Sequence, residues 1–337
     1  MGYLDGKVAV VTGSGRGIAR GIALLMAEEG AKVVVNDYGV NVDGTEPRSE
    51  IAEEVVAEIR SKGGTAVASA DSVADWDGSR RIIETAVKNF GKIDILCNVA
   101  GILRDRMVFN MSEEEWDAVI ATHLKGNMFC TRHAAPYMVK QRWGRILNFS
   151  SGSGYGSSGQ ANYAAGKEGI TGFTYAVGRE LGPFGITVNV INPGGTTRMT
   201  QSVPTQAREI RAARGIVPGG GGGAAAARPA AAAAPQQRQA PAEGAPTPGD
   251  PNNNAPIIVW LCTEQGGAVN GQRIGSSGWQ VTFTDPRRVI RSISKPGRWT
   301  VDDLIRLVPA SLTQGIPNVA PPVEPQAAPA QAAARTS

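Results

Sequence analysis

The residue types best suited to chemistry lie between Ser150 and Lys167, where a serine pair precedes a tyrosine and a lysine. Tyr163 and Lys167 are four positions apart, so a helix would place both side chains on one face. A free phenol has a pKa of about 10, and a cation held beside it favours phenolate and lowers that pKa. Such a pair could exchange a proton near neutral pH while a serine hydroxyl binds the substrate oxygen. The alternative is that a tyrosine and a lysine share a helix by chance.

A second pattern, at the start of the chain, is typical of nucleotide binding. Residues 7–12 are a valine-rich run that predicts a buried parallel strand, and a glycine-rich turn at 13–19 precedes a helical pattern ending near Gly30. A second valine strand over 31–36 ends at Asp37, twenty residues after Gly17. Glycines let the backbone approach a pyrophosphate at the positive end of a helix, and a carboxylate can hold ribose hydroxyls. This order of elements predicts a dinucleotide site.

The alternation of strands and helices continues to about residue 195 and predicts an α/β fold. We expect a Rossmann-type doubly wound parallel sheet in a single domain, with ligands at the carboxyl ends of its strands. Ser112 is the expected N-cap of a helix that carries His123, runs to about 141 and is kinked at Pro136. Further helices are expected over 49–62, 77–89, 255–262 and 301–307, and the helix that carries Tyr163 and Lys167 is expected to end near 181. Further strands are expected over 65–69, 93–98, 145–149 and 187–191, with the last strand over 269–276.

Composition divides the chain into four parts. Residues 1–214 are predicted to form the Rossmann dinucleotide-binding and catalytic domain, and residues 215–254 a low-complexity Gly/Ala/Pro insert. Residues 255–316 complete the Rossmann domain and add a C-terminal extension, and residues 317–337 are expected to be a disordered tail. Too few large apolar residues lie in the insert to offset the entropy of ordering it, so we expect residues 219–245 to be mobile.

Charge and cysteine content argue against several other classes of protein. The 337 residues carry a net charge of +4, without a basic stripe that would indicate a nucleic-acid partner. We see no apolar run long enough to span a membrane and no secretory signal. Cys97, Cys130 and Cys262 lack metal-binding spacing and are expected to be buried, reduced thiols, so we predict no metal site and a cytoplasmic location.

Taken together, these motifs resemble those of the short-chain dehydrogenases/reductases. Residues 12–19 are similar to the family's TGxxxGIG turn with Ala19 at its last glycine, and residues 98–101 to its NNAG motif with Val99 at the second place. Tyr163 and Lys167 match YxxxK. Within the family, the chain most resembles the (3R)-hydroxyacyl-CoA dehydrogenase part of peroxisomal multifunctional enzyme type 2, through segments such as 101–106, 123–126 and 159–163.

The resemblance implies hydride transfer between NAD and a secondary alcohol or ketone, with a 3-hydroxyacyl-CoA as the expected substrate. It implies Tyr163 as general acid/base, Lys167 as its partner and ribose ligand, and a serine that positions the substrate oxygen. It also implies a homodimer or homotetramer. The implied cofactor-binding residues are Gly13, Arg16, Gly17, Ile18, Asp37, Asp71, Ser72, Asn98, Ala100, Gly101, Tyr163, Lys167, Pro193, Gly194 and Thr197.

Three further departures from the family pattern bear on the chemistry. Alignment of the preceding strand makes Ser151 the catalytic serine, whereas spacing from the tyrosine favours Ser150; we assign Ser151. His123 stands where many relatives carry an asparagine of the proton relay, and it could relay protons or only pack. The low-complexity insert stands where relatives have the substrate lid, which leaves open a steroid or terpenoid alcohol dehydrogenase, or a nucleotide-binding scaffold without turnover.

Two residues give opposite indications about the cofactor. Arg16 lies where a basic side chain in relatives often contacts the 2′-phosphate of NADP, and Asp37 lies where a carboxylate binds the ribose diol. Two unit charges about 4 Å apart at an effective dielectric near 20 repel by about 4 kcal/mol, so the carboxylate would oppose a 2′-phosphate. We therefore expect NAD, with NADP less favoured.

Overall fold

The computed structural model describes residues 2–48, 50–202, 247–284, 291–296, 298 and 300–314. The chain divides into two compact units, Met1–Pro286 and Arg287–Ser337. The sites predicted from the sequence all belong to the first unit. The predicted mobile insert, up to residue 246, and the predicted disordered tail lie outside the described residues.

A parallel sheet organises the first unit and confirms the predicted fold class. The strand order is β3-β2-β1-β4-β5-β6-β7-β8, and each pair from β3 to β7 is parallel. Because the order reverses between β1 and β4, the carboxyl ends of these two strands flank a crevice where ligands bind in such folds. The strands are β1 (Val8–Thr12), β2 (Lys32–Asn36), β3 (Thr65–Ser69), β4 (Ile95–Asn98), β5 (Gly144–Phe149), β6 (Ile186–Pro193), β7 (Arg273–Ser277) and β8 (Gln280–Thr284).

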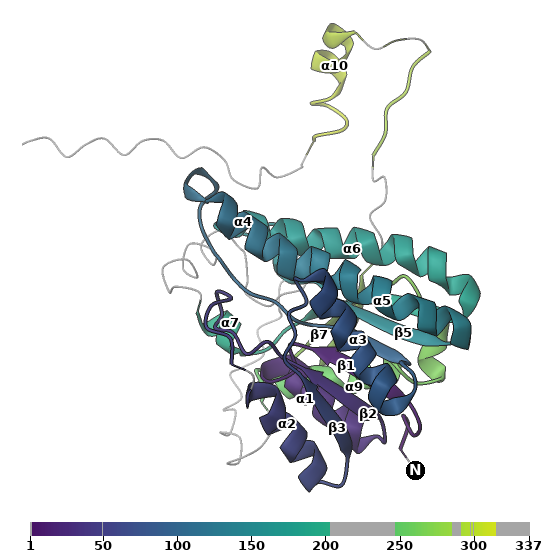
Figure 1. Ribbon diagram of the computed structural model, residues 1–337. Coiled ribbons are helices and arrows are strands. Elements are labelled where there is room, and N and C mark those ends of the chain that lie inside the picture. Colours follow the sequence, from purple (N-terminus) through teal and green to yellow (C-terminus); the bar gives the residue numbers. More distant parts are fainter. Residues whose placement is uncertain are drawn as a thin grey trace, which may run out of the picture. The chain divides into compact units, whose positions relative to one another are not determined.

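Helices cover both faces of this sheet (Figure 1). Side chains of α1, α2 and α9 pack in one core cluster, and side chains of α3, α5 and α6 pack in the other. The helices are α1 (Gly17–Glu28), α2 (Glu50–Ser61), α3 (Trp76–Phe90), α4 (Glu113–Ile120), α5 (Gly126–Gln141), α6 (Ala161–Leu181), α7 (Arg198–Gln201) and α9 (Ala255–Leu261). Short 3₁₀ segments are η1 (Val108–Asn110), η3 (Gly152–Tyr155), η4 (Gly182–Phe184), η5 (Pro251–Asn254) and η6 (Gln265–Ala268).

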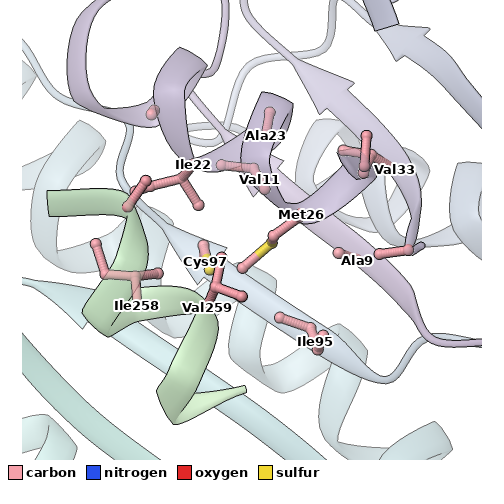
Figure 2. Close-up of a cluster of buried hydrophobic side chains, with 14 of the residues drawn as sticks. Ala9, Val11, Ile22, Ala23, Met26, Val33, Ile95, Cys97, Ile258 and Val259 are labelled. Carbon is pink, nitrogen blue, oxygen red and sulfur yellow. The ribbon is translucent and has the colours of Figure 1, made fainter. Parts of the chain in front are cut away.

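The valine-rich strands read as unbroken apolar runs because both of their faces are buried. In β1, Ala9 and Val11 face the α1 side, whereas Val8 and Val10 face the α3 side. Figure 2 shows the first of these clusters, where Met26 of α1 lies among side chains of β1, β4 and α9. Helix α9, which follows the residues outside the description, is therefore part of the same core.

Two segments differ from the prediction. The helix expected from Ser112 to about 141 is interrupted by a π-helical segment, η2 (Ala121–Lys125), and α5 then continues through Pro136, where the kink stays a prediction. Single π-helical turns are frequent at functional sites, and here the turn carries the buried His123. The predicted N-cap is confirmed, because Ser112 and Glu115 form a capping box.

The sheet also continues past its expected last strand. After β7, Gly278 adopts a φ of 58°, and the chain reverses so that β8 pairs antiparallel with β7 from Ser277 and Gln280 onward. The last eight residues of the predicted insert are also described. They include η5, whose Asn254 is fully buried and donates from Nδ2 to the Gly194 carbonyl at 2.9 Å. The described residues after this gap thus begin at 247, within the range predicted for the insert.

The described part of the second unit contains helix α10 (Val301–Leu307), as predicted. Thr300 and Asp303 form a capping box at its start. Lys295 forms an ion pair with the same aspartate.

Candidate active site

The glycine turn between β1 and α1 forms one wall of the crevice. Gly13 and Gly17 adopt φ values of 68° and 57°. A Cβ on Gly13 would lie 2.8 Å from Cα of Ala100, so only glycine fits against the end of β4. Arg16 is exposed and caps α1 without a side-chain hydrogen bond. The first N–H groups of this helix are thus left for an anion, which fits the pyrophosphate of a dinucleotide.

Asp37, at the end of β2, is fixed by two backbone donors. Its Oδ2 accepts from Gly15 N at 2.8 Å and its Oδ1 from Gly39 N at 2.7 Å. Arg198 of α7 donates from Nη2 to the carbonyl of Val40 at 3.1 Å. Burial and the nearby Arg16 lower the pKa of Arg198, while Asp37 opposes that shift. A carboxylate and two arginines therefore share the end of the crevice where a ribose would lie.

Three of the predicted cofactor-binding residues hold the scaffold through their side chains. The Asn98 amide nitrogen donates to Asn148 Oδ1 at 2.9 Å and to Thr131 at 3.3 Å, inside the sheet. The Asp71 carboxylate accepts from Nε of Arg81 at 2.7 Å, and the Ser72 hydroxyl accepts from Ala74 N at 3.2 Å. These side chains join neighbouring elements at the strand ends and are engaged with protein partners.

Thr12 joins the glycine turn to the end of β4. Its hydroxyl accepts from the backbone N–H groups of Val99 and Ala100 at 3.0 and 3.2 Å. This contact holds residues 98–101 beside the turn.

Two further predicted residues lie nearby. Ile18 is half-buried on α1. Gly101 lies against His123, because a Cβ on Gly101 would lie 2.3 Å from Cε1 of that histidine.

The segment after β6 lies against the glycine turn from the opposite side. Gly194 N donates to the Ser276 carbonyl at 2.6 Å, directly after the half-buried Pro193. Thr197 caps α7, and a Cβ on Gly17 would lie 3.6 Å from its Cγ2. Gly17 and Thr197, far apart in the sequence, thus face each other across the crevice.

The structure brings Tyr163, Lys167 and Ser151 together. Lys167 Nζ lies 5.5 Å from the centre of the Tyr163 ring and donates to the Phe149 carbonyl at 2.7 Å. The Ser151 hydroxyl lies near enough to Tyr163 to lower its pKa, and it also accepts from Ser153 N at 3.2 Å. Ser150 is instead turned into α6, where its Oγ donates to the Lys167 carbonyl at 2.8 Å. The geometry therefore supports Ser151 over Ser150 as the serine that can reach a substrate oxygen beside the phenol.

Burial has the largest influence on the pKa of both residues of the pair. It raises the pKa of Tyr163 to about 12, against a smaller lowering by the Ser151 hydrogen bond. It lowers the pKa of Lys167 to about 7. Both shifts follow from the loss of water around the charged form. In the chain by itself the expected lowering of the tyrosine pKa by the lysine is not found: burial raises this pKa, and the charge that also shifts it is that of Asp105.

His123 packs edge-on against Tyr163, with 5.1 Å between the ring centres. Its Nε2 lies 2.8 Å from the Ile102 carbonyl oxygen, and its buried Nδ1 has no hydrogen-bond partner among the described residues. Burial, and secondarily the charge of Lys167, lower its pKa well below the usual value and keep the imidazole neutral. These contacts of His123 are those of a packing residue that supports the tyrosine ring.

The sequence reasoning missed Arg198, Asn192 and Arg273, which lie around the crevice and the serine loop. Arg198 carried one usable sign, because it directly follows Thr197, one of the expected cofactor-binding residues. Arg273 carried another, because an arginine inside a buried strand pattern needs partners. No spacing rule connects Arg273 to Ser151, which lies far before it in the chain.

The comparisons with known proteins agree with this geometry. A family model described as short chain dehydrogenase matches residues 7–208. The chain belongs to the short-chain dehydrogenase family. As a member, it is an oxidoreductase of the nicotinamide-dependent class, and the predicted resemblance is confirmed.

Three similar proteins illustrate the relationship. Peroxisomal multifunctional enzyme type 2 of Drosophila melanogaster is 50% identical over 200 residues, which are 59% of this chain and 33% of that protein. Hydroxyacyl-CoA dehydrogenase ChsB1 of Mycobacterium tuberculosis is 37% identical over 303 residues, 87% of this chain and 84% of that protein. The crystal structure of a short chain dehydrogenase from Mycobacterium avium is similar, with a TM-score of 0.73 and 38% identity. The match covers 94% of this chain and 98% of the chain in that structure.

The chain spans only a third of the length of the fly multifunctional enzyme. It covers most of the length of the hydroxyacyl-CoA dehydrogenase of Mycobacterium tuberculosis. All three cysteines are free and buried, as expected. Among the helices that the structure describes, none is both long and apolar enough to cross a membrane.

The lowered pKa of Lys167 predicts a particular pH dependence of stability. The folded pKa of about 7 lies below the unfolded value, so between these values the unfolded chain binds a proton that the folded chain lacks. Below the folded pKa, the buried lysine is charged and destabilises the folded chain to the full extent. This loss of stability is regained as the pH rises toward the unfolded pKa of about 10.4. In Lys167→Met this dependence should vanish. The free energy of unfolding of the unmodified chain should therefore rise relative to that of the variant, by up to about 1.4 kcal/mol per pH unit.

Denaturant unfolding at pH 7, 8 and 9.5 would measure this difference. Lys140→Met, on the exposed end of α5, is the matched control and should shift stability by the same amount at every pH. Parallel pH curves for the unmodified chain and Lys167→Met would contradict the desolvated lysine.

Proposed function

We propose that this chain is an NAD-dependent dehydrogenase that transfers a hydride between C3 of a 3-hydroxyacyl-CoA and the cofactor. The carrying observation is the set of buried Tyr163 and Lys167 with the half-buried Ser151, in which the serine lies beside the phenol and the desolvated lysine lies 5.5 Å from its ring centre. The substrate class is supported by the hydroxyacyl-CoA dehydrogenase that matches most of the chain.

Each residue of the set has a separate role in the proposal. Ser151 donates a hydrogen bond to the substrate oxygen and orients it toward the phenol. Because the pKa of Tyr163 is raised in the free chain, this phenol stays protonated and can donate its proton to a ketone oxygen directly. In the oxidation direction the phenol oxygen of Tyr163 takes the proton of the substrate hydroxyl. Oxidation therefore requires that the phenol has first lost its own proton. Lys167 lies under the ring and is the proposed ribose ligand.

The bound cofactor supplies or accepts the hydride. Among the residues proposed to hold it, Gly13, Gly17 and Thr197 shape the crevice. The others are Arg16, Ile18, Asp37, Asp71, Ser72, Asn98, Ala100, Gly101, Tyr163, Lys167, Pro193 and Gly194, with Asn98, Asp71 and Ser72 acting through the scaffold contacts of their side chains.

A steroid or terpenoid alcohol dehydrogenase using the same site is the second candidate. It shares every residue of the set, so only the substrate distinguishes the two. A nucleotide-binding scaffold without turnover is disfavoured because the serine, tyrosine and lysine are all in place.

The remaining proposals concern assembly and compartment. We propose a homodimer or homotetramer that pairs through the helices carrying His123 and Tyr163, as expected from the family. The free, buried cysteines are compatible with the cytoplasm, whereas two relatives are named as peroxisomal. Size-exclusion chromatography with light scattering would measure the assembly.

An absorbance assay at the nicotinamide band would test the proposed activity. The purified chain and NAD would be tested with 3-hydroxyacyl-CoAs, steroid alcohols and simple secondary alcohols. Turnover of the hydroxyacyl-CoAs supports the first candidate, and turnover of steroids alone the second.

Tyr163→Phe removes the titrating hydroxyl and keeps the ring, so turnover should fall by about 10² to 10⁴, with NAD affinity little changed. Unchanged turnover in this variant would exclude Tyr163 as the proton donor.

Cofactor choice follows from the fixed carboxylate of Asp37. Both of its oxygens are held by backbone N–H groups, so it would face a 2′-phosphate as a like charge, and NAD should be preferred. Asp37→Ala removes this repulsion and leaves Arg16 and Arg198 nearby, so the preference should move toward NADP.

The ratio of kcat/KM for NAD and NADP, in the unmodified chain and in Asp37→Ala, measures the effect. Asp43→Ala is the control, because this exposed carboxylate lies on the same loop and bonds Thr45. An unmodified chain that prefers NADP, or an alanine variant with an unmoved ratio, would disprove the assignment.

A further inference from the structure

Arg273, the first residue of β7, is a buried cation whose donors are directed at three separate elements. Only 3% of its surface is exposed. Nε and Nη2 both lie 3.0 Å from the side-chain oxygen of Asn192, in the amide orientation that satisfies both groups. Nη2 also donates to the Ser151 carbonyl at 3.4 Å. Nη1 donates to the Glu168 carboxylate at 3.0 Å.

The positions of these partners matter more than their number. Ser151 is the serine beside the phenol, Asn192 directly precedes Pro193, and Glu168 directly follows Lys167. The guanidinium also stacks on Tyr155, 4.1 Å from the ring centre, at the far end of η3. One planar group therefore joins the serine loop, the end of β6 and helix α6. A guanidinium can do this because its donors form a rigid fork, which an ammonium lacks.

A core role alone does not account for a charge at this position. Burying a cation is costly unless it is paired and hydrogen-bonded, and an apolar residue would fill a strand position without that cost. The neighbouring strand residue, Ile274, is such a residue and is fully buried. The contacts of Arg273 are also concentrated at the catalytic end of the sheet, since Ser151 and Asn192 both lie just beyond or at the carboxyl ends of their strands.

We propose that Arg273 is a positioning residue, which holds the Ser151 loop in register with Tyr163 and Lys167 and with the segment that follows Asn192. It contacts no reacting atom. It acts through the Ser151 carbonyl, fixing the backbone from which the serine hydroxyl reaches the phenol. This inference rests on the proposed function, in which that hydroxyl orients the substrate oxygen.

Arg273→Met tests the proposal, because it keeps the length of the stem and removes the fork. A displacement of about 1 Å at a reacting group can cost about 10²-fold in rate, so kcat should fall by about 10- to 100-fold at saturating NAD. The decisive measurement is the same substitution in a Ser151→Ala background. If Arg273 acts through the serine hydroxyl, it should lower kcat there by less than about 3-fold, because residues that act as a unit are non-additive.

Arg80→Met is the matched control, because Arg80 also pairs with carboxylates but lies exposed on α3; it should leave kcat unchanged. Arg273→Lys is the second variant if the methionine variant does not fold. It keeps a charge beside Glu168 and gives up the fork, so a smaller loss with the same non-additivity is expected.

Losses of Arg273→Met and Ser151→Ala that multiply in the double variant would overturn the positioning role, as would unchanged kcat in both Arg273 variants. An unmodified chain that oxidises no alcohol of the panel, or Ser151→Ala with unchanged kcat, would overturn the proposed function and this inference together.

Discussion

Desolvation of Tyr163 and Lys167 is the constraint on which the active site depends. Both residues lie on the inner face of α6, and burial moves the pKa of each toward its neutral form. A lone buried ammonium is unstable, so Lys167 bonds the Phe149 carbonyl at the end of β5. The phenol in turn lies beside Ser151, on the loop that follows β5. The proposed catalytic set is therefore tied to the sheet through the bond between Lys167 and the end of β5.

The sheet collects residues from distant parts of the chain at one edge. Parallel strands all end on the same side, so the glycine turn after β1, Asp37 after β2 and Ser151 after β5 converge. Hydrogen bonds also link neighbouring strand ends: the Thr12 hydroxyl accepts from Val99 N after β4, and Gly194 N donates to the Ser276 carbonyl of β7. The crevice is a consequence of strand order, and its chemistry comes from the few side chains placed there.

Much of the fold could be predicted from the sequence, because buried parallel strands and glycine turns leave strong local patterns. The positions of Asp37 and of Tyr163 relative to Lys167 followed from spacing alone. The pKa of Tyr163 did not, because a sequence shows a neighbouring cation but not the burial that outweighs it. The π-helical turn at His123 and the hairpin at Gly278 depend on backbone geometry that nearby residues only weakly encode. Arg273 depends on long-range partners, which no local pattern reveals.

The central claim is that burial, and not Lys167, sets the pKa of Tyr163 in the chain without cofactor. Its most direct test is a phenolate titration by ultraviolet difference absorbance, comparing the unmodified chain with Tyr163→Phe in the absence of cofactor. The difference between the two proteins isolates this one phenol from the other tyrosines. We predict that it stays un-ionised through pH 10 and titrates near the pKa of about 12 set by burial. A Tyr163 component that ionises at pH 10 or below would contradict the account.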